Sequence, residues 1–145
     1  MIHKLSLLAL LYFNCYPIQN EGGIDWLSIE EVQAKMESEP KDVFIDIVAD
    51  WCKWCKVMDK NTFADQEVIS FVSNNYYAVR LDYESVEEID FLGKKLVAKD
   101  LAQSWGVQDL PTVVFWKKGF EEKFLSKGYQ DQKQFLETLQ LFNSL

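Results

Sequence analysis

Runs of apolar residues along the chain predict its strands. Residues 43–49 are almost continuously apolar and β-branched, which is typical of a strand covered on both faces. Residues 76–82 and 112–116 predict two further strands. A polar turn at 117–119 follows the last of them, so we expect residues 121–126 to return beside it as a hairpin partner.

The segments between these runs carry helix signals. Ser28 and Glu31 have the spacing of a capping box and predict a helix through about Ser38. Asp131 is expected to cap a last helix whose apolar residues recur on one face. Further helical segments are expected from the paired cysteines to about Asn61, after Asp65, and within 96–105. This order predicts the α/β class, a central mixed β-sheet flanked by helices on both faces.

Length and charge narrow the class of protein. The 145 residues fit a single domain without repeats. Fifteen basic residues stand against 23 acidic ones, a formal charge of -8. Because binding to the phosphates of nucleic acid requires a basic surface, we expect no nucleic-acid partner.

The numbers of cysteine and histidine exclude some scaffolds. Three cysteines are too few for a disulfide-stapled fold, and an odd number leaves at least one thiol unpaired. A structural zinc site needs about four nitrogen or sulfur ligands. The single histidine, His3, and one cysteine, Cys15, lie in the first fifteen residues. We therefore expect no metal and no cofactor.

The first nineteen residues have the composition of a secretory signal. A basic start at Met1–Lys4 precedes the apolar run Leu5–Phe13. The run is too short to span a bilayer, which takes about 20 residues; the alternative interpretation is an N-terminal core helix. We expect residues 1–19 to be a signal peptide and residues 20–145 to form the domain, in the periplasm or another extracytoplasmic compartment.

Cys15 allows a second interpretation of this leader, as a lipoprotein signal whose cysteine is acylated. Tyr12, Phe13 and Asn14 match poorly to the small residues expected before a lipidated cysteine. Removal of Cys15 with the signal is therefore the prediction we favour. Contact with a membrane is expected only if Cys15 carries a lipid anchor.

Cys52 and Cys55 form a C-x-x-C motif at the start of a helix, directly after the buried strand. The chain turns there so that both sulfurs lie at the helix N-terminus, where the peptide dipoles and free N–H groups stabilise a thiolate. We expect Cys52 to attack a disulfide, being at the helix start and nearer solvent, and Cys55 to resolve the mixed disulfide. The alternatives are a structural disulfide and half of a metal site.

The residues around this motif suit the same chemistry. Lys53 and Lys56 add positive charge near the sulfurs and are expected to tune them. Trp51 and Trp54 offer flat apolar surface for binding a peptide.

Two further features are predicted to converge on the motif. Leu110 and Pro111 precede an apolar strand, where a cis bond would leave a backbone edge free to pair with a substrate; the alternative is an ordinary trans loop proline. Asp46 lies in a strand that should be wholly buried, and a buried carboxylate is costly unless paired or protonated. We expect Asp46 to exchange a proton with Cys55 through a water, or else to be a satisfied structural residue.

Together these residues resemble the thioredoxin superfamily, over a region from about Trp26 to the C-terminus. The markers are a buried acid, a C-x-x-C motif with its flanks, a Leu-Pro-Thr triplet and a glycine before the last helix: Asp46, Ala49–Lys56, Leu110–Thr112 and Gly128. The runs 46–52, 56–65 and 91–96 resemble in particular the C-terminal domain of DsbD-type thiol-disulfide interchange proteins and small exported thioredoxin-like proteins. Some of these exported relatives carry an extra hairpin at the last run.

The resemblance implies a thioredoxin fold, a redox-active Cys52–Cys55 disulfide, a cis peptide bond before Pro111 and a buried acid at Asp46. The chain also departs from the family. Lys53-Trp54 replaces the Gly-Pro of cytosolic thioredoxin and the His-containing pairs of oxidants and isomerases, which favours a reductase.

Two other departures concern charge and length. Arg80 stands where relatives often carry a lysine near the buried acid, so it would pair with Asp46 or else be a surface charge at a strand edge. The stretch Glu84–Lys99 is longer than in a minimal thioredoxin and could shape the choice of partner.

The leading prediction is an exported thiol-disulfide oxidoreductase with a role in cell redox homeostasis. It would reduce protein disulfides through a mixed-disulfide intermediate. Its partners would be protein thiols and disulfides together with an upstream electron-donor protein, because an oxidising compartment does not keep the two cysteines reduced. The alternatives are a disulfide isomerase or oxidant, and a non-catalytic module that binds peptides.

Overall fold

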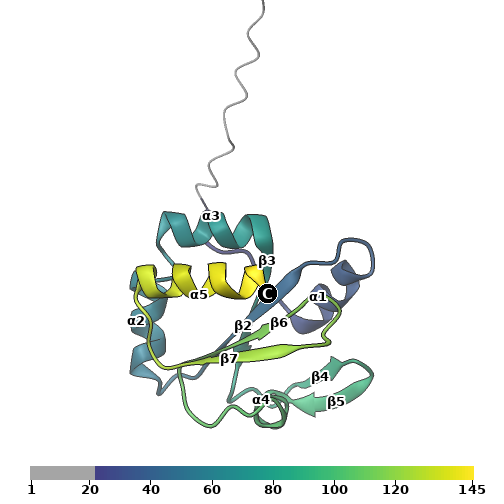
Figure 1. The fold of residues 1–145 in the computed structure, drawn as a ribbon. Helices are drawn as coiled ribbons and strands as arrows, with labels where there is room; N and C mark the ends of the chain where they lie inside the picture. Colours follow the sequence, from purple (N-terminus) through teal and green to yellow (C-terminus); the bar gives the residue numbers. More distant parts are fainter. Residues whose placement is uncertain (1–21) are drawn as a thin grey trace, which may run out of the picture.

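A mixed β-sheet forms the centre of the molecule. The computed structural model describes residues 22–145, and within them the main sheet has the strand order β1-β3-β2-β6-β7 (Figure 1). Its strands are Trp26–Leu27 (β1), Asp42–Val48 (β2), Tyr76–Asp82 (β3), Thr112–Trp116 (β6) and Lys123–Lys127 (β7). β1, β3 and β2 run parallel, whereas β6 and β7 pair antiparallel as the predicted hairpin.

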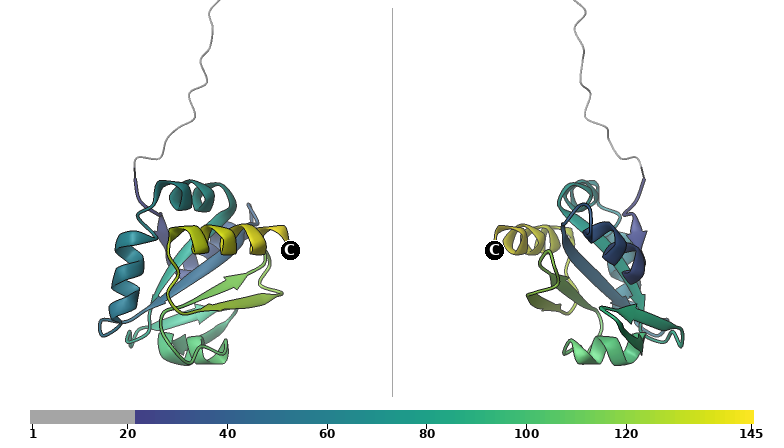
Figure 2. Two further views of the ribbon diagram at one scale, coloured as in Figure 1. Left: turned by 60° about the vertical axis from the view of Figure 1, so that its left-hand side comes forward. Right: turned by 90° about the vertical axis from the view of Figure 1, so that its right-hand side faces the viewer.

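Helices cover both faces of this sheet, as Figure 2 shows from two sides. α2, α3 and α5 pack on one face and α1 and α4 on the other. Their bounds are Ile29–Met36 (α1), Lys53–Asn61 (α2), Gln66–Asn75 (α3), Ala98–Ser104 (α4) and Gln132–Ser144 (α5). The prediction of an α/β thioredoxin fold, with a mixed sheet between two layers of helices, is confirmed.

Each face of the sheet has its own hydrophobic core because side chains alternate along a strand. In β2, Val43, Ile45 and Ile47 are buried under α1 and α4. Phe44 points to the other face, where it packs with residues of α2, α3 and α5. Asp46 lies two residues after Phe44 in β2 and therefore points to the same face of the sheet. Its carboxyl group is directed to the face that α2 covers.

A second, two-stranded sheet was not predicted from the hydrophobic pattern. β4 (Glu88–Phe91) pairs antiparallel with β5 (Lys94–Val97), and Leu92 and Gly93 form the turn with φ of 52° and 79°. The resemblance to exported relatives suggested a hairpin here. Because residues 94–97 are paired with β4, the helix predicted within 96–105 begins at Ala98.

Two strands of the main sheet also differ from the predictions. β1 was not predicted, because its two residues, Trp26 and Leu27, are too few for a hydrophobic pattern to reveal. β7 begins at Lys123 because the turn after β6 continues through Glu122, whose carbonyl accepts a hydrogen bond from Lys117 N–H. The signal peptide predicted over residues 1–19 lies outside the described residues.

Candidate functional site

The two cysteines of the motif are joined at the N-terminus of α2. Cys52 is the N-cap residue and Cys55 lies in the first turn, with an S–S distance of 2.11 Å and a Cα–Cα distance of 5.3 Å. The backbone N–H of Cys55 donates a hydrogen bond to Cys52 Sγ at 3.2 Å. The sulfur of Cys52 therefore takes the place of a capping side chain, at the positive end of the helix dipole.

Solvent exposure does not distinguish the two cysteines. Each is 3% exposed, so the expectation that Cys52 lies nearer solvent does not describe this disulfide-bonded structure. Their surroundings differ instead: Cys55 Sγ lies 3.9 Å from the carbonyl oxygen of Ile47 in β2, whereas Cys52 Sγ faces a helix N–H group. Only Cys52 is held where a thiolate would accept a hydrogen bond from the first turn of α2.

Asp46 belongs to a charged network under α2. Its side chain is 2% exposed, and its Oδ2 atom lies 3.2 Å from an Nη atom of Arg80, its register partner in β3. The same guanidinium nitrogen pairs with Oδ1 of Asp59 in α2. Arg80 therefore faces the buried acid and is not a surface charge at a strand edge.

Aromatic rings hold the guanidinium in place. The Arg80 Cζ atom lies 4.1 Å from the centroid of the Trp26 ring and 5.8 Å from that of Phe63. Nε of Arg80 is buried without a hydrogen-bond partner among residues 22–145. Cation–π contact with Trp26 thus stabilises a guanidinium group that hydrogen bonds satisfy only in part.

The environment of Asp46 favours its protonated form. Burial raises the pKa of Asp46 to about 7; the positive charge of Arg80 and its hydrogen bond act in the opposite direction, and the negative charge of Asp59 raises it further. A carboxyl group with this pKa exchanges protons readily near neutral pH.

Two residues of this network, Asp59 and Trp26, were not predicted from the sequence to be functional. Asp59 follows Cys55 by four residues, which is the spacing that places two side chains on the same face of a helix. That spacing could have identified it. Trp26 carries no such signal, because its contact with Arg80 depends on the pairing of β1 with β3.

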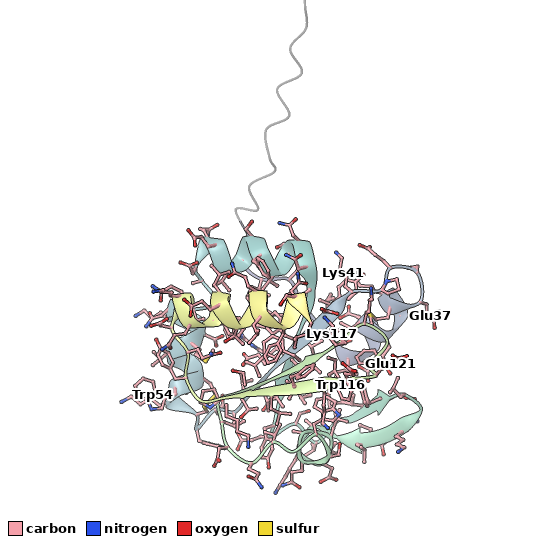
Figure 3. The ribbon with its side chains drawn as sticks, in the orientation of Figure 1. Glu37, Lys41, Trp54, Trp116, Lys117 and Glu121 are labelled. Carbon is pink, nitrogen blue, oxygen red and sulfur yellow. A yellow bond between two sulfur atoms is a disulfide. The ribbon has the colours of Figure 1, made fainter. Side chains whose placement is uncertain are left out.

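The side chains flanking the cysteines lie on the surface. Trp51 is 62% exposed and Trp54 is 54% exposed. Trp54 projects from α2 away from the body of the domain, and its ring centroid lies 5.2 Å from that of Tyr129 (Figure 3). Lys53 and Lys56 are also exposed, in the first turns of α2.

The Leu110–Pro111 peptide bond is cis and lies beside the disulfide. Leu110 is half-buried and packs against Ala49 and the two cysteines. Pro111 is buried, and its carbonyl oxygen accepts a hydrogen bond from Gly128 N–H at 2.8 Å. The side chain of Pro111 is thus covered by the protein itself, so any contact with a substrate from this position involves the exposed part of Leu110 and the backbone.

Within residues 22–145, no group of three or more His, Cys, Asp and Glu side chains is arranged to hold a metal ion. No helix in the same region is long and apolar enough to cross a membrane.

The fold and the cysteine pair define a thioredoxin-like disulfide oxidoreductase of the DsbD and DsbH kind. A protein-family model described as "Thioredox_DsbH: Protein of unknown function, DUF255" matches residues 16–144. The chain belongs to this family.

Individual relatives agree with this assignment. The thiol:disulfide interchange protein DsbD of Actinobacillus pleuropneumoniae serotype 5b (strain L20) is 31% identical over 115 residues, which are 77% of this chain and 18% of that protein. The chain spans a fifth or less of the length of the DsbD proteins that it matches.

Solved structures show the same fold. One described as "DsbH Oxidoreductase" has a TM-score of 0.67 at 16% identity and covers 99% of this chain and 96% of its own. The oxidised C-terminal domain of DsbD from Neisseria meningitidis has a TM-score of 0.58 at 20% identity, over 80% of this chain and 98% of that domain.

Proposed function

We propose that this chain is an exported reductase of protein disulfides. The observation that carries the proposal is the position of the Cys52–Cys55 pair at the start of α2, the helix whose Asp59 is linked through Arg80 to the buried acid Asp46. The absence of histidine between the two cysteines supports reduction over oxidation, because no imidazolium is there to stabilise the reduced thiolate strongly. Several relatives are named thiol:disulfide interchange proteins.

The reaction begins with the reduced pair. The thiolate of Cys52 attacks one sulfur of a partner's disulfide; a new S–S bond forms, the partner's S–S bond breaks, and its second sulfur leaves as a thiolate that takes up a proton. Cys55 then loses its proton and attacks Cys52 Sγ. This step forms the intramolecular disulfide and releases the partner's first sulfur, so two electrons have passed to the partner. A protein dithiol upstream returns them.

Asp46 is the proposed base for the second step. Cys55 Sγ lies 3.9 Å from the carbonyl oxygen of Ile47, the residue next to Asp46 in β2, and we propose that a water carries the proton between Cys55 and Asp46. Because the pKa of Asp46 is raised to about 7, its carboxylate can accept the proton of a thiol near neutral pH. Lys53 and Lys56 add positive charge on the outer side of the pair.

Substrate contacts are proposed around the exposed end of α2. Trp51 and Trp54 provide exposed apolar surface on either side of Lys53. Leu110 and the backbone at Pro111 border the disulfide from the loop before β6. An extended segment of a partner protein would lie across these groups while its cysteine bonds to Cys52.

Export is proposed from the composition of residues 1–19, which matches a secretory signal. The domain at residues 20–145 would then act outside the cytoplasm, with a membrane anchor only if Cys15 is acylated. Mass spectrometry of the N-terminus of the native protein distinguishes cleavage, acylation and retention of the leader. An intact, unmodified Met1 on the native protein would contradict export by this signal.

Reduction of insulin disulfides tests the activity. We expect catalysis by the wild-type chain, its loss in Cys52→Ser, and a trapped mixed disulfide in Cys55→Ser. The reduction potential then gives the direction: a value near ~-270 mV is typical of a reductant and one near ~-120 mV of a strong oxidant. Catalysis retained by Cys52→Ser, or a potential close to that of the oxidant, would contradict the proposal.

A further inference from the structure

A groove of about 360 Å³ opens beside Trp51, the residue that precedes Cys52. Its lining combines apolar and charged side chains from the loop before α2, the segment between β3 and β4, the end of β5 and the start of α4: Trp51, Tyr83, Glu84, Ser85, Val86, Val97 and Lys99. The volume is at the low end of the range for small-ligand sites, roughly 300–1,000 Å³, and accommodates one or two amino-acid side chains.

The groove is continuous with the reactive site. Trp51, which forms one wall, directly precedes Cys52 in the chain. Tyr83, on another wall, also packs against the cluster formed by Ala49 and the two cysteines. A polypeptide whose cysteine is bonded to Cys52 therefore passes the mouth of this groove.

One backbone hydrogen bond and one from the backbone to a side chain hold the walls in place. Tyr83 N–H donates to the carbonyl of Val48 at 2.8 Å, which ties the segment after β3 to the end of β2. Glu84 accepts a hydrogen bond from Asp50 N–H at 3.2 Å, next to Trp51. Because the groove is already formed in the free protein, binding of a partner does not carry the entropic cost of ordering its walls.

Apolar and charged side chains share the surface of the groove: Glu84 and Lys99 are its charged lining residues, and further carboxylates lie in the adjoining stretch of chain. Val86 is 86% exposed and Trp51 is 62% exposed, and two large neighbouring apolar side chains exposed in this way are typical of an interaction site. The stretch from Asp82 to Glu88 contains four carboxylates and no basic residue. This charge favours a partner that carries a positive residue beside its apolar one.

We propose that the groove binds a branched aliphatic side chain near the reactive cysteine of the partner protein, with a lysine or arginine adjacent to it in the same extended segment. Val86, Val97 and Trp51 contact the aliphatic side chain, and the carboxylates around the groove pair with the basic one. The inference rests on the proposed reductase activity and names the class of sequence that the enzyme selects.

Peptide disulfides test this selectivity. Each substrate is a symmetric dimer of a nine-residue peptide joined through its single cysteine, so attack on either sulfur is equivalent. The residue pair near the cysteine is Leu-Lys, Ser-Lys, Leu-Glu or Ser-Glu, placed before the cysteine in one series and after it in another. The second-order rate constant for reduction by the stoichiometrically reduced 145-residue chain is measured for each peptide.

We expect the best Leu-Lys peptide to react about tenfold faster than its Ser-Glu counterpart, equivalent to about 1.4 kcal/mol. In Val86→Ser the ratio of the Leu-Lys rate to the Ser-Lys rate, which isolates the aliphatic side chain, falls towards one, because a hydroxyl replaces the apolar wall. Leu141→Ser is the matched control, since Leu141 is 58% exposed on α5 and should retain the tenfold ratio. Equal rates for all peptides, or an unchanged ratio in Val86→Ser, would overturn the inference.

A binding measurement separates this inference from the activity. The ¹⁵N-labelled oxidised chain is titrated with a Leu-Lys peptide in which serine replaces cysteine. Chemical-shift changes at the amides of 83–86 and Val97, smaller in Val86→Ser, would support peptide binding in the groove. If they occur while no peptide is reduced, only the reductase proposal fails. Shifts absent from these amides overturn the groove even if insulin is reduced.

Discussion

At the scale of single residues, the carboxyl group of Asp46 makes stability depend on pH. Its folded-state pKa of about 7 lies above the ordinary value of 3.8, so the folded protein binds this proton more tightly. The resulting stabilisation is fully present below about pH 4 and is lost as the pH rises through about 7. Asp46→Asn should therefore be more stable than wild type at pH 8, by up to about 4 kcal/mol, since one pKa unit corresponds to about 1.4 kcal/mol.

Urea unfolding of the oxidised proteins at pH 4.5 and pH 8 measures this difference. The advantage of Asp46→Asn should be small at the lower pH and large at the higher one. Asp50→Asn serves as a control because Asp50 is an exposed carboxyl near the same helix. An advantage of equal size at both pH values would show that packing, and not ionisation, separates Asp46→Asn from wild type.

Arg80 and Asp59 should move the pKa of Asp46 in opposite directions. Arg80 lowers it by attraction and by a hydrogen bond, whereas Asp59 raises it by repulsion. We expect Arg80→Met to raise the pKa of Asp46 by about one unit or more and Asp59→Asn to lower it, because opposite and like charges nearby have opposite effects. A ¹³C NMR titration of the Asp46 carboxyl group in each variant measures both shifts. Shifts of the same sign in the two variants would rule out this description of the network.

At the scale of helices and strands, local sequence signals were the most informative. Ser28 and Asp131 form the predicted N-caps, both within complete capping boxes, because a cap depends only on residues three positions apart. The place of Cys52 at the start of α2 follows from the same kind of local spacing. The β4–β5 hairpin and β1 were harder to predict, since they contain four residues or fewer per strand.

The cap of α5 gives a prediction at this scale. Asp131 accepts a hydrogen bond from Gln134 N–H at 2.9 Å, and the Gln134 side chain accepts one from Asp131 N–H at 3.2 Å. Asp131→Ala removes the first bond and should lower the free energy of unfolding by about 1 kcal/mol. Lys133→Ala, an exposed substitution in the same turn, should change it little. Equal urea midpoints for wild type and Asp131→Ala would show that the cap does not stabilise α5.

At the scale of the whole molecule, pairing between distant segments decides which residues meet. The sequence identified Asp46, Cys52 and Cys55 individually, but the contact of Asp46 with Arg80 depends on the register of β2 with β3. Trp26 joins the network only because β1 pairs on the far side of β3. The groove beside Trp51 likewise combines residues 51, 83–86, 97 and 99, which no local spacing relates.

Side-chain hydrogen bonds from α1 hold the β4–β5 hairpin, whose Phe91 also packs against Trp105 and Trp116. Gln33 donates a hydrogen bond to the carbonyl of Asp90 and accepts one from Leu92 N–H, both at 2.7 Å, and Glu30 accepts one from Asp90 N–H at 3.1 Å. Gln33→Ala removes two of these bonds. Because each contributes about 1 kcal/mol, amide hydrogen exchange at Leu92 should accelerate by roughly tenfold or more.

The main sheet should be unaffected by this change, because the strands of the hairpin pair with each other and not with β2 or β3. The exchange rate of Val79 in β3 and the reduction potential of the cysteine pair should stay at their wild-type values in Gln33→Ala. Lys35→Ala, another substitution on α1, should leave Leu92 unchanged as well. Faster exchange at Val79 in Gln33→Ala would mean that the hairpin and the main sheet open together. A substitution in the hairpin would then also disturb the sheet that positions the two cysteines.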